Sequence, residues 1–125
     1  MSTQRTVFST ACAAAIAGAS LMLSVQPAFA QNQDAMQKLA ATGVQFAGSN
    51  ARVATDVCGV DAGTVSKYKD SSKKKFAQDT NFEADWQLGW QKAQKTVTGY
   101  VEMKNRDPKE YETQKTAACA EMNLK

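Results

Sequence analysis

Apolar positions recur every three or four residues along most of the chain after residue 33, which is the spacing of one buried face of an α-helix. The first run predicts a helix over residues 34–47. Gly48-Ser49-Asn50 then interrupts the pattern, and its serine or asparagine is suited to cap a second, short helix that ends near Cys58. One long bent helix over residues 34–58 fits the pattern equally well. The apolar face of the first run consists of Met36, Leu39, Ala40, Val44 and Ala47.

Two aspartates predict the starts of two further helices. Asp61 follows the glycine stop at Gly59, and its carboxylate can accept a hydrogen bond from a free backbone N–H of the next helix. Asp107 precedes a proline and, three residues on, a glutamate, a pattern typical of a capped helix with proline at its first position. The side chains expected to face inward from this last helix are Tyr111, Ala118, Cys119 and Met122.

The most regular pattern lies in residues 80–103, which predict a single amphipathic helix. Thr80 and Glu83 have the spacing of a capping box, in which hydroxyl and carboxylate each satisfy a free backbone donor. The apolar face of this helix carries Phe82, Trp86, Gly89, Trp90, Ala93, Val97, Tyr100 and Val101. No segment shows the alternation of a β-strand. The expected fold is all-α, a small bundle of four to five short helices packed antiparallel around the face of Trp86 and Trp90.

The first thirty residues differ from the rest because Arg5 is their only charged side chain. The uncharged stretch at residues 11–25 has the length of a secretory signal's hydrophobic region and is short for a membrane span. The triplet Ala28-Phe29-Ala30 has the small-x-small pattern that signal peptidase accepts. We therefore predict a signal peptide over residues 1–30, cleaved after Ala30. The mature part, residues 31–125, is expected to be a single helical domain without a membrane span, exported to a periplasm or out of the cell.

The cysteines predict one disulfide. Cys12 lies in the leader, where a small apolar residue fits, and no leucine-like residue three places before it supports a lipid anchor. Cys58 and Cys119 remain, and an even pair in a small exported chain is most simply bonded. The bond would close a loop of roughly 60 residues, for which loss of chain entropy in the unfolded state contributes on the order of 4 kcal/mol.

Composition excludes several classes of function. The sequence has no histidine, which removes His general bases, Ser-His and Cys-His pairs, and His-ligated zinc or haem. Glu83 and Asp85 are two residues apart and point to nearly opposite sides of a helix, so they make a poor catalytic carboxylate pair. We expect no enzymatic activity, no cofactor and no metal. The leader-free chain has a net charge of about +2, which is too weak to predict nucleic-acid binding.

Residues 67–75, KYKDSSKKK, contain five lysines. On a helix these lysines point in different directions and form no single basic stripe, so a solvated surface is favoured over a dedicated anion site.

The remaining candidate site is a groove for a ligand or partner formed by Trp86, Gly89 and Trp90. A glycine between two tryptophans suggests a place where another backbone or a ring approaches closely, although plain core packing also explains the tryptophans. The leading functional hypothesis is a non-enzymatic periplasmic or secreted factor that binds a protein partner, as an inhibitor, an immunity protein or a stress accessory. A small-molecule or lipid carrier that uses the Trp86 and Trp90 face is the first alternative, and an acid-stress chaperone is the second.

Overall fold

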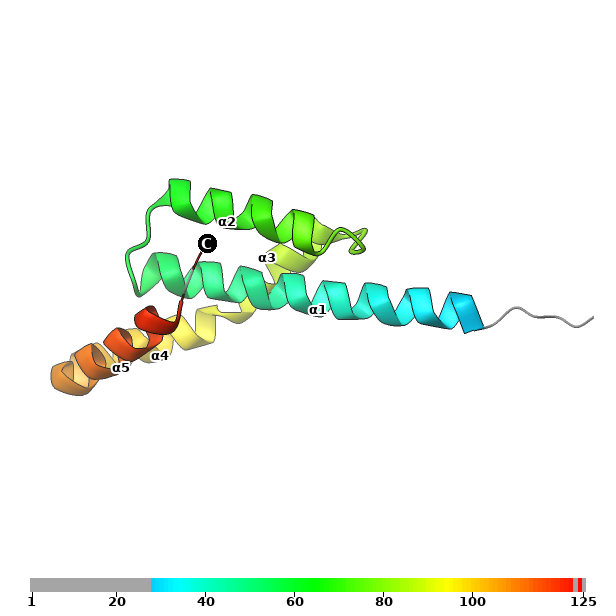
Figure 1. Ribbon diagram of the computed structural model, residues 1–125. Coiled ribbons are helices and arrows are strands. Elements are labelled where there is room, and N and C mark those ends of the chain that lie inside the picture. The colour runs from blue at the N-terminus through cyan, green and yellow to red at the C-terminus, as the bar shows by residue number, and fades with distance from the viewer. Residues whose placement is uncertain (1–27, 123, 125) are drawn as a thin grey trace, which may run out of the picture.

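The computed structural model describes residues 28–122 and 124, and these residues form five α-helices and no strand (Figure 1). The helices are α1 (Ala28–Asp56), α2 (Ala62–Lys75), α3 (Phe82–Lys92), α4 (Gln94–Arg106) and α5 (Pro108–Glu121). The predicted all-α bundle is confirmed. Most of the signal peptide predicted for residues 1–30 lies outside the described residues.

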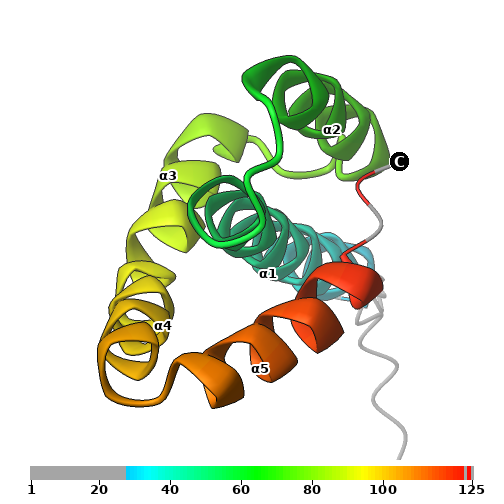
Figure 2. The ribbon, with the colours of Figure 1, turned by 90° about the vertical axis from the view of Figure 1, so that its left-hand side faces the viewer.

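Helix α1 is the centre of the molecule, and α2 to α5 follow one another around its C-terminal half (Figure 2). It is 29 residues long, so the prediction of only short helices is wrong for this element. Of the two alternatives for residues 34–58, the single helix is the one formed. Helix α2 runs back alongside α1, α3 crosses it, and α4 and α5 form an antiparallel pair (Figure 1).

The small polar triplet at residues 48–50 serves a helix crossing and does not start a new helix. A Cβ atom on Gly48 would collide with the carbonyl oxygen of Trp86, and one on Gly89 would collide with the carbonyl oxygen of Gln45. The backbones of α1 and α3 therefore touch at two glycines, one from each helix. Ser49 contributes its hydroxyl to the same contact, because its Oγ donates a hydrogen bond of 2.7 Å to the carbonyl oxygen of Gly89.

The long helix predicted over residues 80–103 is interrupted at Ala93, where α3 ends and α4 begins. The carbonyl oxygen of Gly89 accepts both the Ala93 N–H and the Ser49 hydroxyl. A side chain bonded into the backbone ladder is a known cause of helix kinks. The kink turns α4 away from α3 so that it continues along α1 toward the disulfide.

The predicted capping box at the start of α3 is also wrong. The N-cap is Asn81, and its side chain makes no capping hydrogen bond. Thr80 instead accepts a hydrogen bond of 2.6 Å from Gln37 of α1, and Glu83 pairs with Lys69 of α2. Both side chains are used for contacts between helices, which local spacing does not reveal.

The two predicted aspartate caps are confirmed. Asp61 accepts the Thr64 N–H at 2.9 Å, and Asp107 accepts the Glu110 N–H at 3.0 Å with Pro108 at the first helical position. Gly59, in the loop before α2, has a positive φ of 69°, which favours glycine. These short-range signals fixed the starts of α2 and α5.

The core consists of two clusters. The first joins α1 to α3, with α2 packed against it, and its buried members are Val44, Ala47, Ala51, Phe82 and Trp86. The second joins the end of α1 to the start of α4, and its buried members are Val53, Val57, Ala93 and Val97. Helix α5 supplies no fully buried residue to either cluster.

Candidate functional site

The predicted groove residues lie mostly inside the α1–α3 contact. Trp86 is only 3% exposed and stacks near Phe82, while Gly89 is buried against the backbone of α1. The close approach expected at Gly89 is thus made by the Gln45 carbonyl. Trp90 is half-buried and remains the most accessible of the three.

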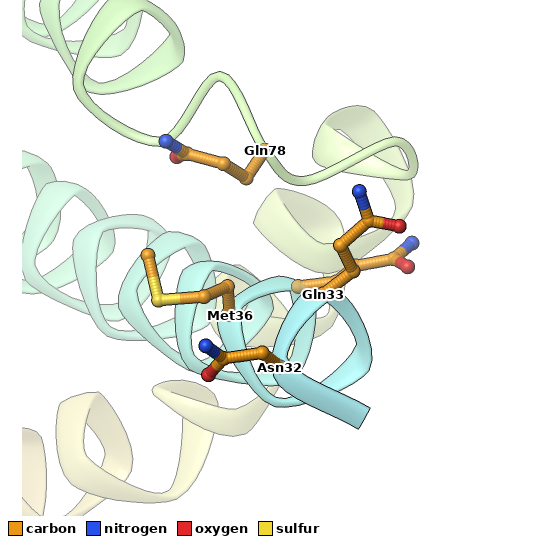
Figure 3. A pocket seen from close by; sticks show the side chains of 5 residues that line it. Asn32, Gln33, Met36 and Gln78 are labelled. Carbon is orange, nitrogen blue, oxygen red and sulfur yellow. The ribbon is translucent and has the colours of Figure 1, made fainter. Parts of the chain in front are cut away.

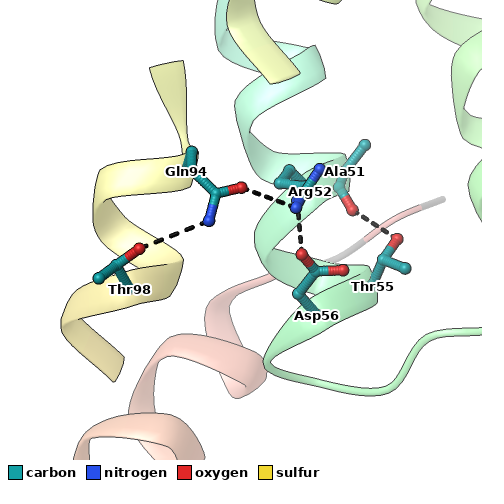
Figure 4. A network of polar contacts seen from close by, with 6 residues as sticks. All are labelled: Ala51, Arg52, Thr55, Asp56, Gln94 and Thr98. Atoms are coloured by element: carbon teal, nitrogen blue, oxygen red, sulfur yellow. Dashed lines mark hydrogen bonds and ion pairs between the residues drawn. The ribbon is translucent and has the colours of Figure 1, made fainter. Parts of the chain in front are cut away.

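Trp90 is covered by Arg52 of α1. The same arginine links α1 to α4 through Gln94 (Figure 4). The guanidinium carbon of Arg52 lies 5.2 Å from the centre of the Trp90 ring, close enough for a cation–π interaction. The same side chain pairs with Asp56 at 2.5 Å and donates to Gln94 at 2.8 Å. The arrangement holds the indole in place and offers it little freedom to receive a ligand.

The predicted disulfide is confirmed. The Cα atoms of Cys58 and Cys119 lie 5.7 Å apart, at the usual separation for a bonded pair, and the two sulfur atoms are bonded. The bond joins the loop after α1 to the last turn of α5. Both cysteines are partly exposed.

The largest apolar side chains of α1 lie on its outside. Leu39 is 69% exposed and Phe46 is 68% exposed, although Leu39 and Met36 were expected to face inward. Phe46 follows Leu39 by seven residues, or about two helical turns, so the two side chains lie on one side of the helix. We call Met36, Leu39 and Phe46 the α1 stripe. The sequence pattern did not single out Phe46, although its spacing from Leu39 is a signal that points to this second face.

A hollow of about 360 Å³ adjoins the α1 stripe at Phe46, between α2 and the end of α5. We call it the α2–α5 hollow. Its lining is mainly apolar and aromatic, with Glu121 as the one charged residue: Phe46, Asn50, Tyr68, Ala118, Glu121, Met122 and Leu124.

A second hollow, of about 440 Å³, lies at the other end of the α1 stripe (Figure 3). Met36 lines it together with Gln78 from the loop before α3 and with three amide side chains from the start of α1: Asn32, Gln33 and Gln37. Amides can hydrogen-bond a ligand but have no nucleophile or titratable group, so this hollow is suited to contact and not to catalysis.

The lysines of α2 are divided between two surroundings. Lys69 and Lys73 turn toward Glu83 of α3, at 2.6 and 3.5 Å, and the hydrogen bond from Lys69 is the main reason that the pKa of Glu83 lies below its usual value. The other three are exposed and form no ion pair with a described residue: Lys67, Lys74 and Lys75. Part of the basic segment is thus structural, and part is available at the surface.

No group of acidic or cysteine side chains that could hold a metal ion occurs among the described residues. Asp79 is the buried acid, and one of its oxygens accepts the Asn81 N–H at 2.8 Å, which shapes the turn before α3. Glu83 is engaged by lysine, and Asp61 and Asp107 cap helices. These four acids thus have structural roles.

Comparisons with known proteins give no assignment, because no family model, curated protein or solved structure matches the chain. Within residues 28–122, no helix combines the length and the apolar character needed to cross a membrane.

Proposed function

We propose that the chain is an exported, non-enzymatic binding protein that acts through a protein partner, as an inhibitor, an immunity protein or a stress accessory. The partner contacts the α1 stripe and the adjoining α2–α5 hollow. The distribution of α1 side chains between core and solvent supports this function.

The observation that carries the proposal is that α1 buries small residues and exposes large ones. Its buried face includes four alanines, whereas Leu39 and Phe46 remain about two-thirds exposed. Full burial of one leucine or phenylalanine contributes roughly 1.5–3 kcal/mol, so a fold selected for stability alone would gain by the reverse arrangement. Large apolar side chains grouped on one face are typical of an interaction site. The alanines concerned are Ala40, Ala47, Ala51 and Ala54.

The partner element we propose is an amphipathic helix with acidic residues beside its apolar side. The α1 stripe and hollow extend from Met36 to Asn50, about 21 Å at 1.5 Å per residue, which matches three to four turns of a helix laid along α1. Helix α2 borders the hollow through Tyr68. Among the unpaired α2 lysines, Lys75 has its Nζ 5.5 Å from the centre of the Phe76 ring, which contacts α1 at Gly43, between Leu39 and Phe46 in the sequence. This lysine beside the apolar side chains of α1 favours an acidic residue at that place on the partner.

A photo-crosslinking residue in place of Phe46 tests this proposal in the oxidised protein, with the same residue in place of Val101 as control. Val101 is 55% exposed and lies on α4, away from the α1 stripe. We expect Phe46 to crosslink one exported protein through an amphipathic, acidic helix, and Val101 to leave that protein unlabelled. Binding of the purified partner should then weaken at least tenfold in Phe46→Glu, about 1.4 kcal/mol, and remain unchanged in Val101→Glu.

Two outcomes contradict the proposal. Equal binding by Phe46→Glu and Val101→Glu would show that the α1 stripe does not carry the interaction. Crosslinking at position 46 to a lipid or another small molecule would instead favour the carrier hypothesis. The ligand would then bind in the α2–α5 hollow and not on the face of Trp86 and Trp90.

A further inference from the structure

We infer that α5 is a strap latched to α1 by the Cys58–Cys119 disulfide, and that reduction of this bond by a dithiol releases α5 while α1, α2 and α3 stay folded. The inference concerns how α5 is held, and it rests on contacts within the chain. Its consequence for partner binding depends on the proposed function.

Helix α5 packs on α4 and has little direct contact with α1. Tyr111 is its one buried residue, and its ring lies 6.4 Å from that of Tyr100 on α4 in an edge-on arrangement. Lys104 and Lys115 lie over the same Tyr111 ring, at 5.6 Å each. The contacts of Tyr100 and Lys104 fix the first half of α5 to α4, whereas Lys115 belongs to α5 itself, so the second half depends on the disulfide and on Met122.

Packing around Met122 is loose. This side chain lines the α2–α5 hollow on one side and a smaller hollow of about 280 Å³ on the other. The smaller hollow lies between α1 and α4 and is bounded by Val53, Ala93 and Tyr100, among others. Both hollows are open to solvent, so part of the Met122 side chain has no protein neighbour and makes fewer dispersion contacts than a fully buried methionine. Met122 packs against the cluster of Val53, Val57, Ala93 and Val97 only in part, and the disulfide is the covalent link from the end of α5 to the end of α1.

The rest of the molecule has a core that does not include α5. The cluster of Val44, Ala47, Ala51, Phe82 and Trp86 joins α1 to α3, and the glycine crossing holds those two helices in backbone contact. Helix α4 joins α1 through Val53, Val57, Ala93 and Val97. A helix of 14 residues with one buried side chain is marginal in water once its far end is unattached.

Release is an ordinary thiol–disulfide exchange. A thiolate of the dithiol attacks one sulfur of the Cys58–Cys119 bond, forming a mixed disulfide and expelling the other cysteine as a thiolate. The second thiol of the reagent then displaces the remaining cysteine, so the protein gains two thiols and the dithiol becomes a disulfide. The reagent can reach the bond because both cysteines are partly exposed.

The strap also forms one wall of the proposed binding site, because Ala118, Glu121 and Met122 line the α2–α5 hollow. Its release opens that hollow and removes Met122 from the neighbouring hollow that it lines together with Val53. Under the proposed function, the oxidised and reduced proteins therefore present different surfaces to the partner.

Hydrogen exchange measured by mass spectrometry on the purified protein tests the strap without any partner. The samples are the oxidised protein, the protein reduced with dithiothreitol, and Cys58→Ser/Cys119→Ser. In the second and third samples we expect residues 108–121 to exchange at least tenfold faster, while peptides from α1 and α3 change less than twofold. Met122→Ala with the disulfide intact is the control, and its α5 should remain protected.

Unchanged protection of α5 after reduction would overturn the inference. Loss of protection in all five helices together would also overturn it, because a disulfide that only stabilises the whole fold behaves in this way. Loss of α5 protection in oxidised Met122→Ala would also overturn it, since the anchor would then be Met122. None of these results depends on crosslinking at Phe46, so a failure of the proposed function remains distinguishable.

Discussion

The same substitution, glycine to alanine, is expected to have opposite effects at two glycines of neighbouring helices. Gly89 lies in α3 at the crossing with α1, where an added Cβ would collide with the Gln45 carbonyl oxygen. Gly99 lies in α4, where an added Cβ has no neighbour within 4 Å. Because both glycines are inside helices, the gain in helix propensity is about equal for the two, roughly 0.5–1 kcal/mol.

At Gly99 this gain is the whole effect, so Gly99→Ala should be more stable than the natural protein by up to about 1 kcal/mol. At Gly89 the added carbon meets backbone, which cannot rotate away as a side chain can, and α1 and α3 must separate. Overpacking of this kind costs roughly 1–3 kcal/mol. Separation also weakens the hydrogen bond from Ser49 to the Gly89 carbonyl, worth about 0.5–1.5 kcal/mol. The net expectation is a loss of about 1–3 kcal/mol.

Urea denaturation followed by far-UV circular dichroism measures both variants, and a thermal scan checks them independently. For a domain of this size, 1 kcal/mol corresponds to a shift in Tm of roughly 4–8 °C. Gly48→Ala should resemble Gly89→Ala, and the double variant should lose less than the two single losses combined, because the helices need to separate only once. If Gly89→Ala equals or exceeds Gly99→Ala in stability, the backbone contact between α1 and α3 is not as described.

Two further predictions concern charge and fluorescence. The pKa of Glu83 is lowered, so its pair with Lys69 stabilises the fold above about pH 4.5, and this stabilisation is lost as the pH falls through the folded-state pKa. Glu83→Gln should therefore be slightly less stable at pH 7, and its stability should decline less toward acid pH in urea titrations at pH 7, 5 and 3. The same pH profile in Glu83→Gln and the natural protein would contradict this. Acrylamide quenching of tryptophan fluorescence separates the two indoles. In Trp90→Phe, the remaining Trp86 should emit at a blue-shifted wavelength and be quenched poorly, whereas in Trp86→Phe the remaining Trp90, half-buried under Arg52, should be quenched more strongly. Equal quenching of the two variants would refute the assignment of Trp86 to the core.

Local signals predicted the starts of α2 and α5 because a side-chain cap involves residues close together in the sequence. Asp61 and Asp107 each cap a helix through an N–H three residues away, and both were identified from spacing alone. The disulfide was found by elimination, as the one pair of cysteines outside the predicted signal peptide. Composition and periodicity were likewise sufficient for the all-α class.

The sequence misled where a residue is used by a distant part of the chain. Thr80 and Glu83 have the spacing of a capping box, yet they bond to Gln37 and Lys69. Ser49 looks like a cap and instead bonds to Gly89, forty residues away. In each case a contact between helices outweighed a local preference, and no local pattern contains the partner.

The α1 stripe was missed for a related reason. Periodicity reports that a helix has an apolar face, but it does not decide which face the neighbours cover when two faces are available. The face with Ala40, Val44 and Ala47 permits close approach because its side chains are small, and α3 packs against this face. Leu39 and Phe46 were left outside. The size of the buried side chains, and not their hydrophobicity, decided the packing.

The length of α1 gives the molecule a preferred direction of tumbling. Its 29 residues extend over about 44 Å, roughly twice the span of any other helix. Rotation about α1 meets less friction than end-over-end rotation, so the protein reorients anisotropically in solution. Backbone N–H vectors of α1 lie along this long axis, so only the slow end-over-end rotation reorients them, while those of α3, which crosses α1, lie at an angle to it. The ratio of transverse to longitudinal ¹⁵N relaxation rates should therefore be higher in α1 than in α3, and the difference between them measures the crossing angle set by Gly48 and Gly89.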